Sequence, residues 1–435
     1  MDWPLTSGPF PVIVTVLGAG ALVALCASRR RTWLRQWGPA AAVLAIVATW
    51  LLVVAVDDWW RPLPEPLPRP VDAAIGLAIL GLFLAVFRIP SLRWRGRAAA
   101  VLGAALVVLL GASQVNVYFD QYPTLRTMPG PWALPTKGLK AAAGHKETVL
   151  RPPHGKTLSQ VFHPSPGMPT HGVLTKVSFP DTRSGYASSP GLVYLPPAYK
   201  SSPRPLLPVV MMIPGQPGEP KTYVQSGRIV NALDDFAARH HGLAPIVVIA
   251  DANGSPFVNN LCMNSRRGNV QTYLTQDVPH WIRTHLQTAT GPSHWAVGGY
   301  SFGGTCALQL AVNAPGTFGR FVDISGQREP TLGGHRRTVN AAFGGDEAAF
   351  AQVNPLHVMA RKNFPRTRGL FIVGSGDIHY GPQQRTVCKA AREAGMRVRS
   401  ETLPGGHDWH VWRRALEVQL PWIAQNTGLI PGRPK

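Results

Sequence analysis

Hydrophobic residues are distributed unevenly along this chain. Before residue 118 they form four long, nearly uninterrupted apolar runs, whereas after about residue 170 they occur in short runs separated by polar and glycine-rich segments. About 20 apolar residues are enough for a helix to cross the hydrocarbon core of a bilayer. The four runs therefore predict membrane-spanning helices at residues 10–27, 38–56, 71–89 and 98–117.

The loops between these runs differ in charge, and the difference predicts an orientation. The loops after the first and third runs are rich in arginine, whereas the loop after the second run carries two arginines and three acidic residues. Because arginine-rich loops stay in the cytoplasm, we expect both ends of the four-helix region to lie on the extracytoplasmic side. No basic segment precedes the first run, so we do not expect a cleaved signal peptide.

Ionisable residues occur only at the ends of these runs, as with Asp72 and Arg88. A transporter would be expected to carry charged residues within its spans. This pattern favours a membrane anchor over a transporter with an accessory domain.

After the fourth run the pattern changes twice. Residues 118–170 are rich in proline, glycine, lysine and histidine without helical or strand periodicity, which predicts a linker. In residues 171–428 short apolar runs alternate with amphipathic ones, which predicts βαβ units and a mainly parallel sheet with helices on both faces. Continuous apolar runs such as PIVVIA at 245–250 favour strands buried on both sides.

Ser301 lies in the segment GGYSFGG, between a predicted strand and a predicted helix. Gly-x-Ser-x-Gly at such a junction is typical of a nucleophile elbow, a sharp turn that exposes the serine above the sheet. Gly299 and Gly303 would leave room for that turn, and the N–H of Phe302 would face an oxyanion. An ordinary glycine-rich turn is the alternative that the motif alone leaves open.

Two later residues complete a candidate catalytic triad. Asp377 directly follows a predicted strand, and His407 follows the next one, so the chain order is serine, aspartate, histidine, as in α/β-hydrolases. Asp323, at the end of the preceding strand, is an alternative acid. His379 and His410 are neighbouring histidines that we expect at the surface or behind the site.

Other candidates surround this edge of the sheet. Gln216, after the strand LPVVMMI, is the candidate second oxyanion donor, and the segment 326–368 is the expected cap over the site. The loop at 259–269 follows a strand that ends on the same edge. Cys262 and Cys306 would both lie near this edge, so we predict a disulfide between them outside the cytoplasm. Candidate substrate contacts, each of which could instead face solvent or be structural, are Asn259, Asn260, Arg336 and Arg337.

Residues 171–425 resemble the putative esterase family of α/β-hydrolases, which includes esterase D-type enzymes, enterochelin esterases and mycolyltransferases. The motifs that carry the resemblance are GYSFGG at 299–304, GSGD at 374–377 and GGHDWHVW at 405–412. This chain has PGQPG at 214–218 where many members have HGxxG. The fusion to four membrane spans resembles actinobacterial membrane esterases.

The resemblance implies an α/β-hydrolase fold with Ser301 as nucleophile, His407 as base and Asp377 as the residue that orients the base. It also implies oxyanion donors near Gln216 and Phe302, and no metal or organic cofactor. The activity it implies is ester hydrolysis or acyl transfer through an acyl-enzyme. A catalytically silent hydrolase-fold module that binds or scaffolds envelope components is the alternative from another class.

The charge of the chain narrows the expected partners. Of 43 Lys and Arg and 22 Asp and Glu, 10 and 5 precede residue 118, so the rest of the chain carries a net charge of +16. No zinc-finger spacing, Walker loop or RNA-binding aromatic signature accompanies this charge, which disfavours nucleic acid. An anionic bilayer is the partner we expect, with a lipid or envelope ester as substrate. The sequence leaves the oligomeric state open.

Overall fold

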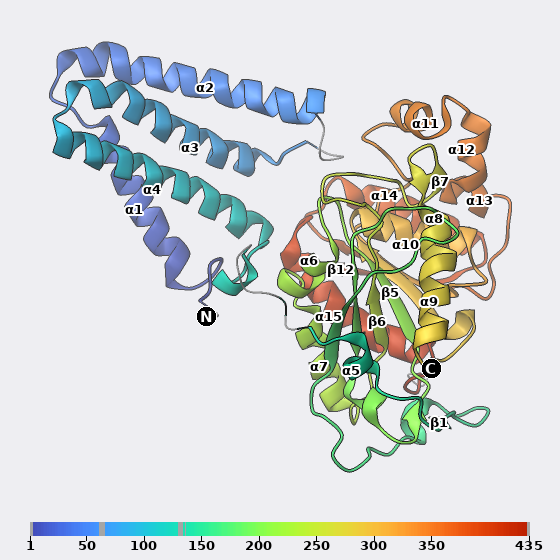
Figure 1. The fold of residues 1–435 in the computed structure, drawn as a ribbon. Helices are drawn as coiled ribbons and strands as arrows, with labels where there is room; N and C mark the ends of the chain where they lie inside the picture. The colour runs from blue at the N-terminus through green and yellow to red at the C-terminus, as the bar shows by residue number, and fades with distance from the viewer. Residues whose placement is uncertain (1–2, 61–65, 129–133, 135, 433–435) are drawn as a thin grey trace. The chain divides into compact units, whose positions relative to one another are not determined.

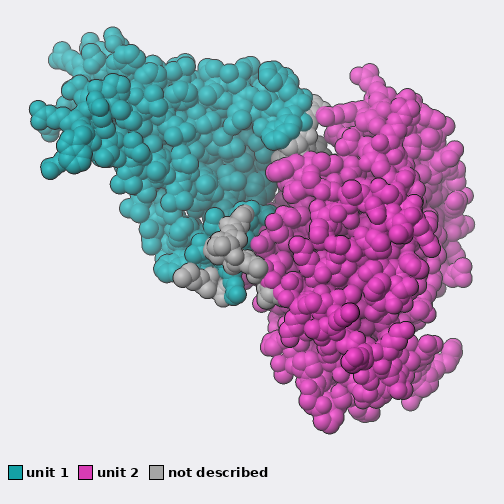
Figure 2. Space-filling view, in the orientation of Figure 1, with its two compact units in different colours: residues 1–132 teal, residues 133–435 magenta. Residues whose placement is uncertain are grey.

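The computed structural model describes residues 3–60, 66–128, 134 and 136–432. The chain divides into two compact units, residues 1–132 and residues 133–435 (Figure 2).

The described part of the first unit contains four long helices (Figure 1). Their bounds are α1 Pro9–Cys26, α2 Gly38–Val54, α3 Arg69–Arg88 and α4 Trp94–Phe119. Short π-helical turns at Trp33–Trp37 and Ala55–Trp60 extend α2 at both ends. All four helices are long and apolar enough to cross a membrane. Each exposes two or more large apolar side chains, which suits helices surrounded by lipid.

Small residues let these helices pack closely. A Cβ atom on Gly111 of α4 would lie 2.7 Å from the carbonyl oxygen of Ala74 in α3. A Cβ atom on Gly81 of α3 would meet Val107 of α4 at the same distance. Glycines that allow backbones to approach are typical of helix contacts inside membranes, where no hydrophobic effect drives association.

The second unit is built on an eight-stranded sheet with the order β12-β11-β10-β9-β5-β6-β3-β2. The six strands from β12 to β6 are parallel, and β3 and β2 add an antiparallel edge. The mainly parallel sheet predicted from the sequence is therefore confirmed. The strands are β2 Val173–Val177, β3 Gly191–Leu195, β5 Val209–Ile213, β6 Ile246–Ile249, β9 Trp295–Tyr300, β10 Arg320–Ile324, β11 Arg368–Gly374 and β12 Arg397–Leu403.

Helices cover both faces of this sheet (Figure 1). α7 and α15 pack against each other on one side, and α10, α13 and α14 form a connected layer on the other. The central strands β3, β5, β6, β9 and β10 are buried along their whole length. Their sequences are mostly apolar, as strands covered on both faces require, although β10 also contains Arg320 and Asp323. The helices are α6 Pro220–Gln225, α7 Ile229–Arg239, α8 Val270–Thr272, α9 Val278–His285, α10 Phe302–Asn313, α11 His335–Phe343, α12 Glu347–Val353, α13 Pro355–Met359, α14 Tyr380–Glu393 and α15 Trp409–Asn426.

The segment predicted to be a linker contributes to the second unit over much of its length. It contains α5 (Leu139–Ala143) and β1 (Val149–Leu150), and β1 pairs with β4 (Arg204–Pro205). Leu158 and Phe162 are buried in the main core. These anchoring residues are too few and too widely spaced to give the sequence a helical or strand period. A small hairpin, β7 Asn264–Ser265 with β8 Gly268–Asn269, completes the elements.

Candidate active site

The turn between β9 and α10 holds Ser301 in a strained conformation. Ser301 is the residue before the first turn of α10, with φ 54°, and its N–H donates to the carbonyl oxygen of Ile324, 2.7 Å away. A Cβ atom on Gly303 would lie 2.0 Å from the carbonyl oxygen of Ile213, and one on Gly299 would lie 2.4 Å from Gly303. Only glycine fits at both places, which is the geometry of a nucleophile elbow.

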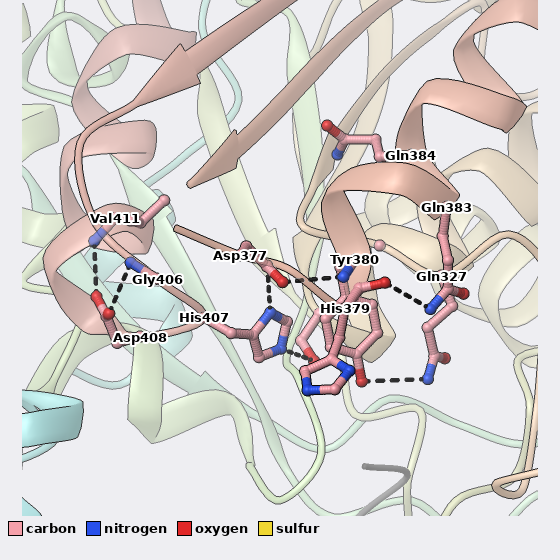
Figure 3. A network of polar contacts seen from close by, with 12 residues as sticks. Gln327, Asp377, His379, Tyr380, Gln383, Gln384, Gly406, His407, Asp408 and Val411 are labelled. Atoms are coloured by element: carbon pink, nitrogen blue, oxygen red, sulfur yellow. Dashed lines mark hydrogen bonds and ion pairs between the residues drawn. The ribbon is translucent and has the colours of Figure 1, made fainter. Parts of the chain in front are cut away.

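Ser301, His407 and Asp377 form a hydrogen-bonded chain at the carboxyl edge of the sheet. The distance from His407 Nδ1 to Asp377 Oδ2 is 2.9 Å (Figure 3). The distance from His407 Nε2 to Ser301 Oγ is also 2.9 Å. The three residues come from the turns and loops that follow β9, β11 and β12. These partners suit the tautomer in which Nδ1–H donates to the carboxylate and Nε2 accepts from the hydroxyl.

Neighbouring groups fix the orientation of the Asp377 and His407 side chains. The N–H of Tyr380 donates to Asp377 Oδ1 at 2.9 Å, so both carboxylate oxygens have partners. The ring of Tyr380 stacks on the imidazole of His407 with ring centres 4.1 Å apart, and Trp412 meets the same imidazole edge-on at 4.9 Å. The carboxylate is 1% exposed and the imidazole 18% exposed. A packed imidazole with one open side is suited to moving a proton repeatedly to and from a substrate.

The alternative acid, Asp323, and the two neighbouring histidines, His379 and His410, are not part of the hydrogen-bonded triad. Asp323 is fully buried in β10, where Oδ1 accepts from the N–H of Gly326 at 2.8 Å. Burial raises the pKa of Asp323 to about 7. His379 and His410 are exposed. Asp408 instead begins α15, accepting from the N–H groups of residues 406, 410 and 411, which shapes the loop that carries the histidine.

The two candidate oxyanion donors lie on neighbouring segments. Phe302 is the first residue of α10, so its N–H belongs to those a helix leaves without an intrahelical partner. Gln216 follows β5, the strand that pairs with β9 beside the elbow, and it is largely buried. Its side chain donates to the carbonyl oxygen of Phe257 and accepts from Asn259, each at 3.3 Å. These bonds hold the loop in place. That the backbone N–H of Gln216 binds an oxyanion stays a prediction.

The four candidate substrate contacts have different environments. Asn259 is buried and joins Gln216 to the carbonyl oxygen of Thr331 in the cap segment. Asn260 is buried too, and its amide donates to Tyr186 and Asn253. Both amides are therefore engaged in holding loops together. Arg336 and Arg337 lie exposed on α11, and no hydrogen bond or ion pair of the described residues joins them to the triad.

A disulfide ties the loop after β6 to the elbow helix. It joins Cys262 to Cys306 across 44 residues of sequence, and Cys306 lies in the second turn of α10, five residues after Ser301. Leu261 and Cys262 both adopt positive φ beside it. The disulfide thus fixes the loop whose Asn259 contacts the predicted oxyanion segment. In the described part of the chain, no three His, Cys, Asp or Glu side chains are grouped to hold a metal ion.

Sequence reasoning missed the aromatic support of His407. Tyr380 and Trp412 stand three and five residues after Asp377 and His407, respectively, and these short spacings were the available signal. The link from Gln216 through Asn259 to Thr331 spans more than 100 residues and left no local pattern in the sequence.

Comparisons with known proteins identify the family and the fold of this chain. Residues 188–423 match the Putative esterase family. The chain is 33% identical over 433 residues to an uncharacterized protein of Corynebacterium glutamicum, covering 96% of each chain. A solved ferulic acid esterase superposes with a TM-score of 0.50 at 18% identity, covering 59% of this chain and 98% of its own. For an S-formylglutathione hydrolase from Agrobacterium tumefaciens the TM-score is 0.48 at 17% identity, with 61% and 99% covered. The chain belongs to the Putative esterase family, and its second unit has the α/β-hydrolase fold.

Proposed function

We propose that this protein is a membrane-anchored serine hydrolase or acyltransferase that acts on a carboxylic ester of a lipid or another envelope component, outside the cytoplasm. The observation that carries this proposal is the hydrogen-bonded chain Ser301–His407–Asp377 at a strained strand–helix turn. Nothing in a binding or scaffolding role requires that arrangement.

The geometry supports a stepwise acyl transfer. His407 takes the proton of the Ser301 hydroxyl as Oγ attacks the ester carbonyl carbon, and Asp377 stabilises the imidazolium that forms. The N–H groups of Phe302 and Gln216 would stabilise the negative oxygen of the tetrahedral intermediate. The intermediate collapses when the C–O bond to the alcohol breaks and His407 protonates the departing oxygen. Water or an acceptor hydroxyl then releases the acyl group from Ser301 by the reverse sequence.

Three features support the membrane location and the lipid substrate. The first unit has four helices able to cross a bilayer, and arginine-rich loops predict that its ends face outward. The Cys262–Cys306 disulfide suits an oxidising compartment such as the cell exterior. The residues after 117 carry a net charge of +16, which holds the second unit close to anionic headgroups.

The test uses the full chain purified in detergent micelles. We expect it to turn over p-nitrophenyl butyrate, and we expect mass spectrometry to find a butyryl group on the peptide that contains Ser301. Adding glycerol or a sugar as acceptor measures how the acyl-enzyme divides between hydrolysis and transfer. Absence of both turnover and acyl-enzyme would favour a silent module instead.

A further inference from the structure

The second unit exposes few large apolar side chains. Among its described residues, 134 and 136–432, those that are exposed are Phe257 at 61%, Val258 at 37% and Ile378 at 77%. Single exposed apolar residues are normal on protein surfaces, and their grouping is what carries information. All three lie on loops at the carboxyl edge of the sheet, the edge that holds Ser301.

The loop that carries Phe257 and Val258 lies directly against the oxyanion segment. The carbonyl oxygen of Phe257 accepts from the side chain of Gln216 at 3.3 Å, and that of Pro256 accepts from the N–H of Gly218 at 3.1 Å. The backbone is therefore held while the side chain of Phe257 remains in solvent.

Ile378 has the corresponding position on the other side of the serine. It stands between Asp377 and the turn that begins α14, and its N–H donates to the carbonyl oxygen of Gly376. In the sheet, β6 and β11 have β5, β9 and β10 between them, so their loops flank the elbow at a separation on the order of 20 Å. The loops that carry the apolar side chains thus lie on both sides of the elbow.

Exposed basic residues lie on or beside α14, the helix that follows Ile378. The N–H of Arg328 donates to Gln383 in the second turn of α14, and the guanidinium of Arg385 lies close to Gly381. Both arginines are exposed. Apolar side chains with neighbouring cations are the composition of surfaces that lie in the interface of an anionic bilayer.

We propose that Phe257, Val258 and Ile378 form a docking rim that inserts into the bilayer interface and brings Ser301 to the esters of membrane lipids. The proposal rests on the proposed function and names its partner, the lipid surface. Four membrane helices on the same chain argue for this occupant over a soluble protein. Only 17 residues separate Phe119, the end of α4, from Lys137, whose N–H already pairs with Leu174, so a short segment tethers the second unit to the membrane helices.

The first experiment measures docking without using activity. Ser255, exposed beside Phe257, is replaced by cysteine in a Cys26→Ser background, and the full chain is labelled with an environment-sensitive nitrobenzoxadiazole dye. In nanodiscs of phosphatidylcholine and phosphatidylglycerol we expect the attached dye to emit more brightly and at shorter wavelength than the free dye emits in water. The double variant Phe257→Ser/Ile378→Ser should return to aqueous emission, whereas the matched Phe257→Leu/Ile378→Leu should keep the shift. Aqueous emission with the wild-type rim would overturn the proposal, as would a shift that follows protein concentration rather than lipid.

The second experiment separates the rim from the catalytic site. The double serine variant should turn over p-nitrophenyl butyrate with unchanged kcat/KM, yet hydrolyse a fluorogenic diacylglycerol ester in the same nanodiscs about tenfold more slowly, because removing apolar contacts weakens interfacial binding. An equal loss on both substrates would mean that these residues contact the substrate inside the site, and docking would be refuted. If the wild type turns over neither substrate, the proposed function fails, and the dye experiment still decides whether the rim docks.

Discussion

The turns and loops after β9, β11 and β12 bring Ser301, Asp377 and His407 together within a few residues of the strand ends. The loops after β5 and β6 reach the same edge of the sheet differently. They depend on a disulfide across 44 residues and on the hydrogen bonds of Asn259 to Gln216 and to Thr331. One half of the site is therefore positioned by the parallel strands themselves, and the other half by long-range links between loops.

This difference separates the residues that carry out the reaction from the loops that surround them. A parallel sheet places its carboxyl strand ends at one edge, so short loops suffice to assemble a triad there. A long loop loses entropy when it is fixed, and a covalent link such as Cys262–Cys306 lowers the entropy of the unfolded chain instead. We expect changes in the first half to abolish activity and changes in the second half to act mainly on stability and loop order.

The largest effect should come from Ser301→Ala. Losing the nucleophile should lower kcat by about 10⁴- to 10⁶-fold, as in other enzymes with this triad. Rates with p-nitrophenyl butyrate would measure this, and circular dichroism would serve as the folding control. A variant that keeps more than a tenth of the wild-type rate would show that another residue is the nucleophile.

Substituting the two buried aspartates, Asp377 and Asp323, tests which of them is the acid of the triad. Asp377→Asn should lower kcat by about 10³- to 10⁴-fold, because the amide disturbs the tautomer of His407. Asp323→Asn should leave kcat within a few-fold of wild type, because Asp323 contacts Gly326 and Gln384 rather than His407. The reverse result would make Asp323 the acid of the triad.

Asp323 should also give the fold a pH dependence. Burial raises its pKa to about 7, so the protonated carboxyl is the form that the folded state favours. The contribution of Asp323 to the stability of the folded state is complete below the ordinary aspartate pKa of about 4 and is lost as pH rises towards 7. Unfolding measured between about pH 4 and pH 8 should show this loss in wild type and a flatter curve in Asp323→Asn. An unchanged curve would show that Asp323 does not titrate in this range.

Removing the disulfide tests the other half of the site. Cys262→Ser/Cys306→Ser should lower the free energy of unfolding by about 3–4 kcal/mol, the loop-closure value for a loop of this length. Activity should fall far less than in the triad variants. Thermal unfolding with and without reductant measures the effect, and peptide mapping under non-reducing conditions should find the two cysteines linked. Free thiols at both positions would contradict the prediction.

The smallest effect should arise in the cap segment. His335 bridges Glu347 at 2.9 Å and Glu329 at 3.1 Å, and these hydrogen bonds raise the pKa of His335. The stabilisation that this bridge gives is complete below the ordinary histidine pKa of about 6.5. It is lost as pH rises through the higher pKa that His335 has in the folded protein. Protection factors of the amides in α11 and α12, which correct for the pH dependence of intrinsic exchange, should therefore be higher at pH 6 than at pH 8, and His335→Gln should remove most of the difference. Equal protection factors at both pH values in wild type would argue against the bridge.

The sequence allowed the architecture to be predicted because its patterns are local. Continuous apolar strands and their alternation with helices predicted the mainly parallel sheet, and the apolar runs predicted helices able to cross a membrane. Ser301, Asp377 and His407 could be proposed together because each follows a strand directly. The stacking of Tyr380 on His407 and the bonds of Asn259 depend on how distant loops fold, which no periodicity records.

An activated Ser301 outside the cytoplasm can be tested directly with a membrane-impermeant fluorophosphonate probe. Intact cells that produce the wild-type chain are compared with cells that produce Ser301→Ala, before and after lysis. We predict labelling of the wild type in intact cells and none of the variant under either condition. Labelling that appears only after lysis would place the second unit in the cytoplasm, and no labelling before or after lysis would contradict an activated serine.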